Sequence, residues 1–203
     1  MTLESLELWL DRLGGAAALA ILILALNGFR RSQRRAQGRA VGVGARYLRF
    51  SIFIFFAVVY FAIGWLLWKP LPLHLPVGVR ITADIAGALL FFPALALYWW
   101  GYRSLGAMFT ASTSFGVRLM ADHCLVSSGP YRFVRHPMYL AVILLGFGGL
   151  LLYRTWAMLV FALTMFGLIL RARREEQVLA AEFGEQWQNY ARQVPGWFPR
   201  LRR

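Results

Sequence analysis

Two polar stretches hold the side chains that could do chemistry, His123–Tyr139 and Arg171–Tyr190. The first stretch ends near Pro137, which suits the first position of a helix because its missing N–H is not needed there. His136 would then lie at the mouth of that helix, where unpaired N–H groups and the positive end of the dipole favour a carboxylate. The spacing predicts an anion-binding helix start, and the plainer alternative is a turn with an interfacial histidine.

The second stretch places Arg171 and Glu175 one helical turn apart, so both side chains can face the same side. Such a pair could hold a charged substrate, and the plainer alternative is a weak surface ion pair. We expect the neighbouring Glu176 to be the solvated carboxylate, beside Arg173.

Five apolar segments must position these residues. Each is long enough, or nearly so, to cross a bilayer, which takes about 20 mostly apolar residues. With 59% apolar and only 15% charged residues, the composition predicts an all-α polytopic membrane protein rather than a soluble one. The segments are Gly14–Phe29, Tyr47–Trp68, Val79–Gly101, Pro137–Tyr153 and Trp156–Leu170. We divide the chain into residues 1–104, with the first three spans, and residues 105–203, a catalytic half.

The last two segments are expected to form a helical hairpin. As one helix, Pro137–Leu170 would run about 51 Å, which exceeds a hydrocarbon core of about 30 Å. Four glycines would let the arms of the hairpin approach closely, namely Gly146, Gly148, Gly149 and Gly167. The chain after Arg171 should continue as a helix into the cytosol, to about Ala191 and stopping near Pro195.

Two features near the third segment lie on the opposite side. The connection Lys69–Arg80 contains three prolines and is predicted to be an extended outer loop. Asp84 follows just inside the third segment, and we expect it at the membrane interface beside Arg80 rather than in a site.

The arginines fix the orientation of the spans. Eighteen basic residues fall in the Arg30–Arg49 loop, the Tyr102–His136 segment and the tail from Arg171, against four on the other side. This asymmetry predicts a C-terminus in the cytosol and an N-terminus outside. The net charge of +13 is better explained by retention of cytosolic loops and contact with anionic lipids than by nucleic acid, since no nucleic-acid-binding module is present.

Three further features of the sequence concern disulfides, the N-terminal segment and the cellular location. The single cysteine, Cys124, excludes an internal disulfide framework. The N-terminus begins with acidic residues, so the first apolar segment is expected to be retained rather than cleaved. The preference for arginine over lysine indicates a GC-rich, bacterial genome and hence residence in the cytoplasmic (inner) membrane.

Two sequence patterns occur in order around the hairpin. They read H-x-L-V-x-x-G-P-Y-x-x-x-R-H-P-x-Y and R-x-x-x-E-E-x-x-L-x-x-x-F-G-x-x-W-x-x-Y. Together they resemble the isoprenylcysteine carboxyl methyltransferase family over about Leu105–Pro199. Upstream of His123, Gly116–Arg118 lacks the glutamine or basic residue that the family often has there.

The resemblance implies a membrane methyltransferase that uses S-adenosylmethionine and acts on a lipid-like or lipidated acceptor. Arg171 matches the arginine that serves the substrate, and it is the catalytic residue that we expect. The positions matching contacts to the cofactor are His123, Cys124, Leu125, Val126, Tyr131, His136, Pro137, Met138, Tyr139 and Glu175. No metal is implied.

Three alternatives remain open. Phospholipid N-methyltransferases carry similar C-terminal motifs, but an amine acceptor would need a base to remove its proton. Membrane sterol reductases share a similar C-terminal half and bind a nicotinamide cofactor, although their chains are longer. A membrane scaffold without catalytic activity is the third alternative.

Overall fold

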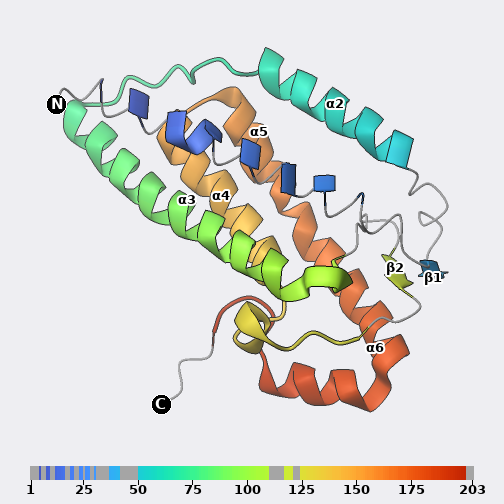
Figure 1. Cartoon of the computed structure of the whole chain (residues 1–203). Helices are drawn as coiled ribbons and strands as arrows, with labels where there is room; N and C mark the ends of the chain where they lie inside the picture. The colour runs from blue at the N-terminus through green and yellow to red at the C-terminus, as the bar shows by residue number, and fades with distance from the viewer. Residues whose placement is uncertain are drawn as a thin grey trace.

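The computed structural model describes residues 5, 8–9, 12–16, 19–20, 23–24, 26–27, 30, 37–41, 50–109, 117–120 and 124–199. The described residues between 5 and 30 are all helical, in the region of the first predicted span. The main helices are α2 (Phe50–Leu66), α3 (Val77–Leu105), α4 (Pro137–Tyr153), α5 (Trp156–Met165) and α6 (Gly167–Gln193). Two 3₁₀ turns, η2 (Gly106–Met108) and η3 (Gly129–Arg132), complete the helical elements (Figure 1).

The predicted helical class is confirmed, with one addition. Strand β1 (Gln37–Val41) pairs antiparallel with β2 (Val117–Met120), so two connecting segments form a small sheet. The prediction of a purely α-helical chain missed this pairing. It joins residues far apart in the chain, and a four- or five-residue strand carries too short a pattern to be recognised locally.

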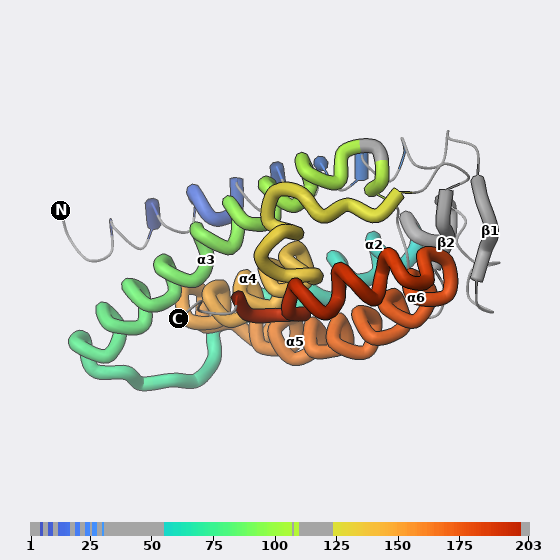
Figure 2. Tube along the Cα trace, turned by 90° about the horizontal axis from the view of Figure 1, so that it is seen from below, coloured from blue at the N-terminus to red at the C-terminus, as the bar shows by residue number. Residues whose placement is uncertain are grey.

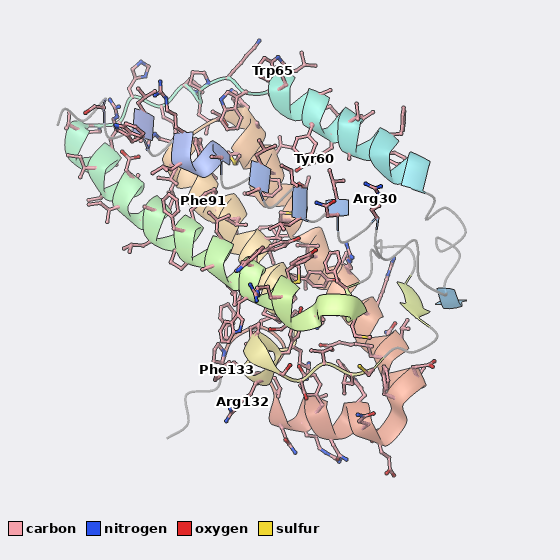
Figure 3. All side chains as sticks on the ribbon, viewed as in Figure 1. Arg30, Tyr60, Trp65, Phe91, Arg132 and Phe133 are labelled. Carbon is pink, nitrogen blue, oxygen red and sulfur yellow. The ribbon has the colours of Figure 1, made fainter. Side chains whose placement is uncertain are left out.

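Two helical stretches are long and apolar enough to cross a membrane. They are α3 and the run Trp156–Gln193, which combines α5 with α6, while α4 and part of α2 are shorter apolar helices. Large apolar side chains on α2 are exposed, and Trp65 is 83% exposed (Figure 3). A lipid environment would cover such a surface, whereas water would not favour it.

Glycines bring α3 and α4 into backbone contact. A Cβ at Gly148 would lie 2.7 Å from the backbone nitrogen of Phe91, and a Cβ at Gly87 would lie 3.0 Å from the carbonyl oxygen of Gly148. Only hydrogen fits at these two positions. Small residues are a common means of tight helix packing in membranes, where exclusion from water does not drive association.

The predicted hairpin is α4 followed by α5. A Cβ at Gly146 would lie 3.0 Å from the Cα of Ala162 in α5, as the prediction required. Arg154 turns the chain in the left-handed conformation (φ 48°), and the Thr155 side chain accepts a hydrogen bond from the Met158 N–H to cap α5. The prediction was wrong for Gly167, because a Cβ there would meet no other described part of the chain within 4 Å.

The loop before α3 is extended, as predicted, and it binds the tip of the hairpin. The Leu71 N–H donates to the Arg154 carbonyl at 2.7 Å, and the Trp156 N–H donates to the Lys69 carbonyl at 3.1 Å. Asp84 is buried within the protein (4% exposed), and its position relative to the membrane interface stays a prediction. Its Oδ1 accepts a hydrogen bond of 2.6 Å from Arg154, because the hairpin tip folds back beside the second turn of α3.

The tail helix is confirmed through Gln193, but it is bent. Gly184 has φ 49° and ψ −120°, a conformation that suits glycine and breaks α6 into two parts. Figures 1 and 2 show the red end of α6 running back toward η3 and the start of α4. The bend therefore returns the C-terminal residues to the polar stretch that precedes the hairpin.

Candidate functional site

The start of α4 carries two stacked rings. His136 is the residue before the helix and Pro137 is its first residue, as the sequence predicted, and both are buried. The rings of His136 and Tyr139 lie 5.6 Å apart with planes inclined by only 2°. Residues three apart share a helix face, which explains why these two side chains meet.

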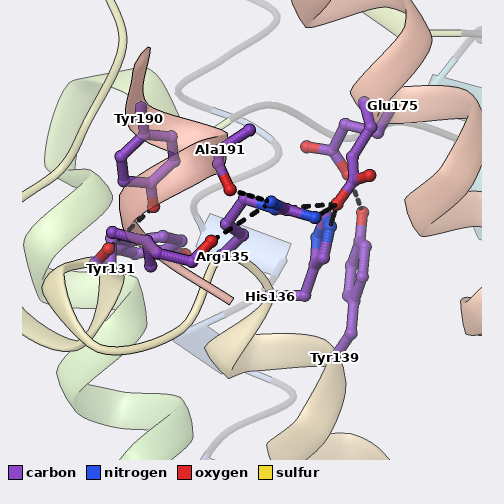
Figure 4. A network of polar contacts seen from close by, with 9 residues as sticks. Tyr131, Arg135, His136, Tyr139, Glu175, Tyr190 and Ala191 are labelled. Atoms are coloured by element: carbon purple, nitrogen blue, oxygen red, sulfur yellow. Dashed lines mark hydrogen bonds and ion pairs between the residues drawn. The ribbon is translucent and has the colours of Figure 1, made fainter. Parts of the chain in front are cut away.

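Two adjacent glutamates of α6 hold these rings, one each (Figure 4). The Tyr139 hydroxyl donates to Glu175 Oε2 at 2.6 Å, and His136 Nε2 lies 2.7 Å from Glu176 Oε1. Both glutamates therefore face α4, and α6 crosses the beginning of α4 at this point.

The expectation that Glu176 would be solvated was wrong. Its side chain is 28% exposed, and its carboxylate forms ion pairs with Arg135 at 3.0 Å and with His136. Burial alone would raise the pKa of Glu176, but the hydrogen bond and charge of His136, together with those of Arg135, outweigh it and lower the pKa. The error arose because α6 lies across the start of α4. Adjacent residues of α6, on different sides of that helix, can then both contact α4.

Arg171 also faces α4 rather than solvent. Its guanidinium carbon lies 5.2 Å from the centre of the Tyr139 ring, a cation–π contact. Arg171 and Glu175 are both half-buried, so a simple surface ion pair does not describe them. The cation, the phenol and the carboxylate form one continuous cluster.

Tyr131 lies in η3, and its side chain is buried. Its carbonyl oxygen accepts a hydrogen bond of 2.7 Å from the Tyr190 hydroxyl near the end of α6. Burial raises the pKa of Tyr131, and burial raises the pKa of Tyr190 to about 12, with Arg135 opposing and Glu176 adding to that rise. Both phenols are therefore neutral hydrogen-bonding groups at physiological pH.

The other predicted site residues are placed differently. Met138 is buried, and it packs with Tyr98 and Ala141 in a core cluster between α3 and α4. Leu125 and Val126 are half-buried and Cys124 is exposed in the segment that leads to η3. His123 lies outside the described residues. Among the described residues, no group of three His, Cys, Asp or Glu side chains could hold a metal ion.

A segment that the sequence patterns did not single out completes this region. We call Val194–Trp197 the C-terminal strap. The Arg135 N–H donates to the Pro195 carbonyl at 2.9 Å, and the His136 N–H donates to the Gly196 carbonyl at 3.1 Å. The Trp197 ring lies 5.6 Å from the His136 ring. The proline and tryptophan of the strap were the signals for this contact in the sequence. They indicate where the helix stops, but not that the strap binds the start of α4.

Comparison with known proteins points to one enzyme class. The model of the phospholipid methyltransferase family matches residues 82–186, a range that runs from α3 to just past the bend in α6. The chain is 29% identical to protein-S-isoprenylcysteine O-methyltransferase B of Arabidopsis thaliana over 62% of this chain and 74% of that protein. It is 31% identical to protein-S-isoprenylcysteine O-methyltransferase of Schizosaccharomyces pombe, over 48% of this chain and 44% of that protein.

A third relative carries a different name. The chain is 40% identical to the cobalt-zinc-cadmium resistance protein CzcN of Cupriavidus metallidurans, over 39% of this chain and 38% of that protein. The match spans less than half of the length of this relative and of the S. pombe protein.

Proposed function

The chain belongs to the phospholipid methyltransferase family of membrane methyltransferases, and we propose that it transfers a methyl group from S-adenosylmethionine to the carboxylate of a lipid-like thioether acceptor. The acceptor is of the isoprenylcysteine type, a class named in two of the relatives. The resemblance to isoprenylcysteine carboxyl methyltransferases that the two motifs indicated is thereby confirmed, and the choice of acceptor is our proposal.

The residues at the start of α4 fit the proposed cofactor. S-Adenosylmethionine supplies an electrophilic methyl group on a sulfonium and also carries an ammonium and a carboxylate. Glu175 suits the ammonium, since it is a half-buried carboxylate that the Tyr139 hydroxyl holds through Oε2. The start of α4 suits the carboxylate, because the first N–H groups of a helix and the positive end of its dipole favour an anion.

The aromatic rings complete the proposed cofactor site. Tyr131 and Tyr139 offer ring faces to an adenine or a sulfonium. We propose that His136 and Pro137 also line the cofactor site. The residues before η3 that we assign to it are His123, Cys124, Leu125 and Val126. Met138 contributes its backbone, because its side chain packs against α3.

The acceptor explains why the cluster has a cation but needs no base. A carboxylic acid has a pKa of about 4 and is already ionised at neutral pH. The protein then has to align the reactants and exclude water. The observation that carries this proposal is the contact of Arg171 with the Tyr139 ring, whose hydroxyl is bound to Glu175. A cation that can clamp an acceptor carboxylate lies beside the anion that suits the cofactor.

The placement in the membrane is part of the proposal. The asymmetry of basic residues favours five spans, with the N-terminus outside and the site facing the cytosol of a bacterial cell. In that arrangement Asp84 and Arg154 lie at the outer end of the α3–α4 pair. Arg171 lies at the inner boundary, where a lipid-anchored carboxylate would be presented.

A lipid amine is the second candidate acceptor, because the matching family model is that of phospholipid methyltransferases. An amine must lose a proton before it accepts a methyl group, so it needs a base near the site. The guanidinium of Arg171 is too weak a base for that role. The two other groups beside the Tyr139 ring are each bound already, His136 to Glu176 and Glu175 to the Tyr139 hydroxyl.

Replacing Arg171 with lysine tests the carboxylate clamp. Lysine keeps the charge but loses the planar two-pronged donor that fits a carboxylate. We expect Arg171→Lys to bind S-adenosylmethionine normally and to transfer methyl groups to a farnesylated cysteine analogue at least about tenfold more slowly, which is about 1.4 kcal/mol of transition-state stabilisation. Arg173→Lys on the exposed side of the same helix is the matched control. Turnover equal to that of the wild type in Arg171→Lys would refute the clamp.

A further inference from the structure

Arg135 links three parts of the chain that are distant in sequence. Its Nε donates to Glu176 Oε1 at 3.0 Å on the first part of α6. Its Nη1 donates to the carbonyl oxygens of Ala191 at 2.9 Å and Val194 at 3.1 Å, where α6 ends (Figure 4). A cation at the C-terminal end of a helix binds carbonyls that have no partner within the helix, and it also opposes the negative end of the dipole.

The same network fixes the C-terminal strap against the start of α4. The backbone N–H groups of Arg135 and His136 both donate to strap carbonyls, and the Trp197 ring lies against the His136 ring. One oxygen of Glu176 contacts both Arg135 and His136, and within the described part of the chain it is the single anion paired with these two side chains. Removing its charge would leave the half-buried Arg135 with backbone carbonyls and the Trp187 ring as its partners, and the His136 ring nitrogen without its carboxylate.

The two neighbouring glutamates therefore differ in what they contact. Glu175 binds the Tyr139 hydroxyl, which lies next to Arg171. Glu176 binds two residues that hold the strap. We propose that Glu176 is a positioning residue, which acts through Arg135 and His136 to keep the C-terminal strap closed over the start of α4, and that it does not itself contact the cofactor.

Closure of the strap has a chemical purpose in a methyltransferase, and this part of the inference rests on the proposed function. With the strap in place, Trp197 covers one side of the His136 ring, and the stacked pair His136–Tyr139 is held at a fixed angle. A covered, fixed binding surface excludes water and lowers the cost of ordering the site when the cofactor binds.

The first test measures the strap without any cofactor. Hydrogen–deuterium exchange in detergent reports on the Arg135 and His136 amides, which are protected only while they donate to the strap. We expect Glu176→Gln to exchange these amides at least about tenfold faster than the wild type, because a charge-assisted contact is lost. Amides in the α3–α4 pair should exchange at the wild-type rate. Glu185→Gln, on an exposed residue of the same helix, should leave both regions unchanged.

The second test separates positioning from contact with the cofactor. We expect Glu176→Gln and Arg135→Gln each to raise KM for S-adenosylmethionine at least about tenfold, with kcat at saturating cofactor within about threefold of the wild type. The double variant should lose little more than either single variant, because both changes open the same strap.

Several outcomes would overturn the inference. Unchanged exchange at Arg135 and His136 in Glu176→Gln would show that this carboxylate does not hold the strap. A large KM effect in Glu176→Gln together with a wild-type KM in Arg135→Gln would assign Glu176 to the cofactor. If Glu176→Gln does not fold, Arg135→Gln decides by the same exchange measurement. A wild-type protein that fails to bind S-adenosylmethionine would refute the proposed function, whereas the exchange measurement would still judge the strap.

Discussion

At the scale of single residues, the site depends on which glutamate faces which ring. The resemblance to the methyltransferase family implied one site with Arg171, Glu175, His136 and Tyr139, and the structure brings these four together. The sequence could not predict the partners of Glu176. Helical spacing describes one face of α6 and does not reveal that a second helix crosses it. The adjacent Arg135 and His136 were the charge signal available, and their partner Glu176 lies 41 and 40 residues further along the chain.

The carboxylate of Glu175 should be worth a charge-assisted hydrogen bond to the ammonium of the cofactor. We expect Glu175→Gln to weaken S-adenosylmethionine binding by more than about tenfold, since such a bond contributes about 1.5–3 kcal/mol. Calorimetric titration measures the effect, with Glu185→Gln as the exposed control on the same helix. Similar affinities in the two variants would mean that Glu175 does not bind the cofactor.

Acid should weaken the network around Glu176. The pKa of this carboxyl is lowered in the folded protein, so its contribution to stability is present above its ordinary pKa of 4.5 and is lost as the pH falls through the lowered value. We expect the wild type to unfold at a higher temperature than Glu176→Gln at neutral pH, and the difference to shrink as the pH is taken below about 4.5. A difference that stays constant down to about pH 3 would contradict this assignment.

At the scale of helices, apolar length and the glycine and proline positions were sufficient to predict most elements. The hairpin, the extended loop before α3 and the tail helix all agree with the structure, and which side of the membrane the loop faces stays a prediction. The bend at Gly184 was not predicted, because a glycine within a helical pattern is tolerated in a straight helix as often as it marks a break. The β1–β2 pair was missed because its partners are separated by two helices.

Close packing of α3 against α4 should make Gly148 intolerant of a side chain. Its Cβ would lie 2.7 Å from a backbone nitrogen of α3, so Gly148→Ala must push the helices apart. We expect a loss of about 1–3 kcal/mol in stability, measured as a lower unfolding temperature in detergent. Gly64→Ala in α2, where a Cβ would meet no other described residue within 4 Å, should be neutral or slightly stabilising. Equal behaviour of the two variants would contradict the backbone contact.

At the scale of the whole molecule, the distribution of arginine determines the orientation that we propose. A reporter that is active only in the cytosol, fused after Arg203, should be active in bacteria, because the basic asymmetry retains that side of the chain in the cytosol. A matched fusion in the Lys69–Arg80 loop should be inactive. Activity in the loop fusion with a well-expressed but inactive C-terminal fusion would reverse the orientation.

The central claim is that this membrane protein methylates a carboxylate, and the chemistry of the product tests it most directly. Purified protein would be incubated with S-adenosylmethionine labelled in its methyl group and with either a farnesylated cysteine analogue or an amine phospholipid. We predict label on the farnesylated cysteine in a form that mild alkali releases as methanol, the signature of a methyl ester. The Arg171→Lys variant should show at least about tenfold less of it. Alkali-stable label on the amine phospholipid, with none on the farnesylated cysteine, would contradict the account.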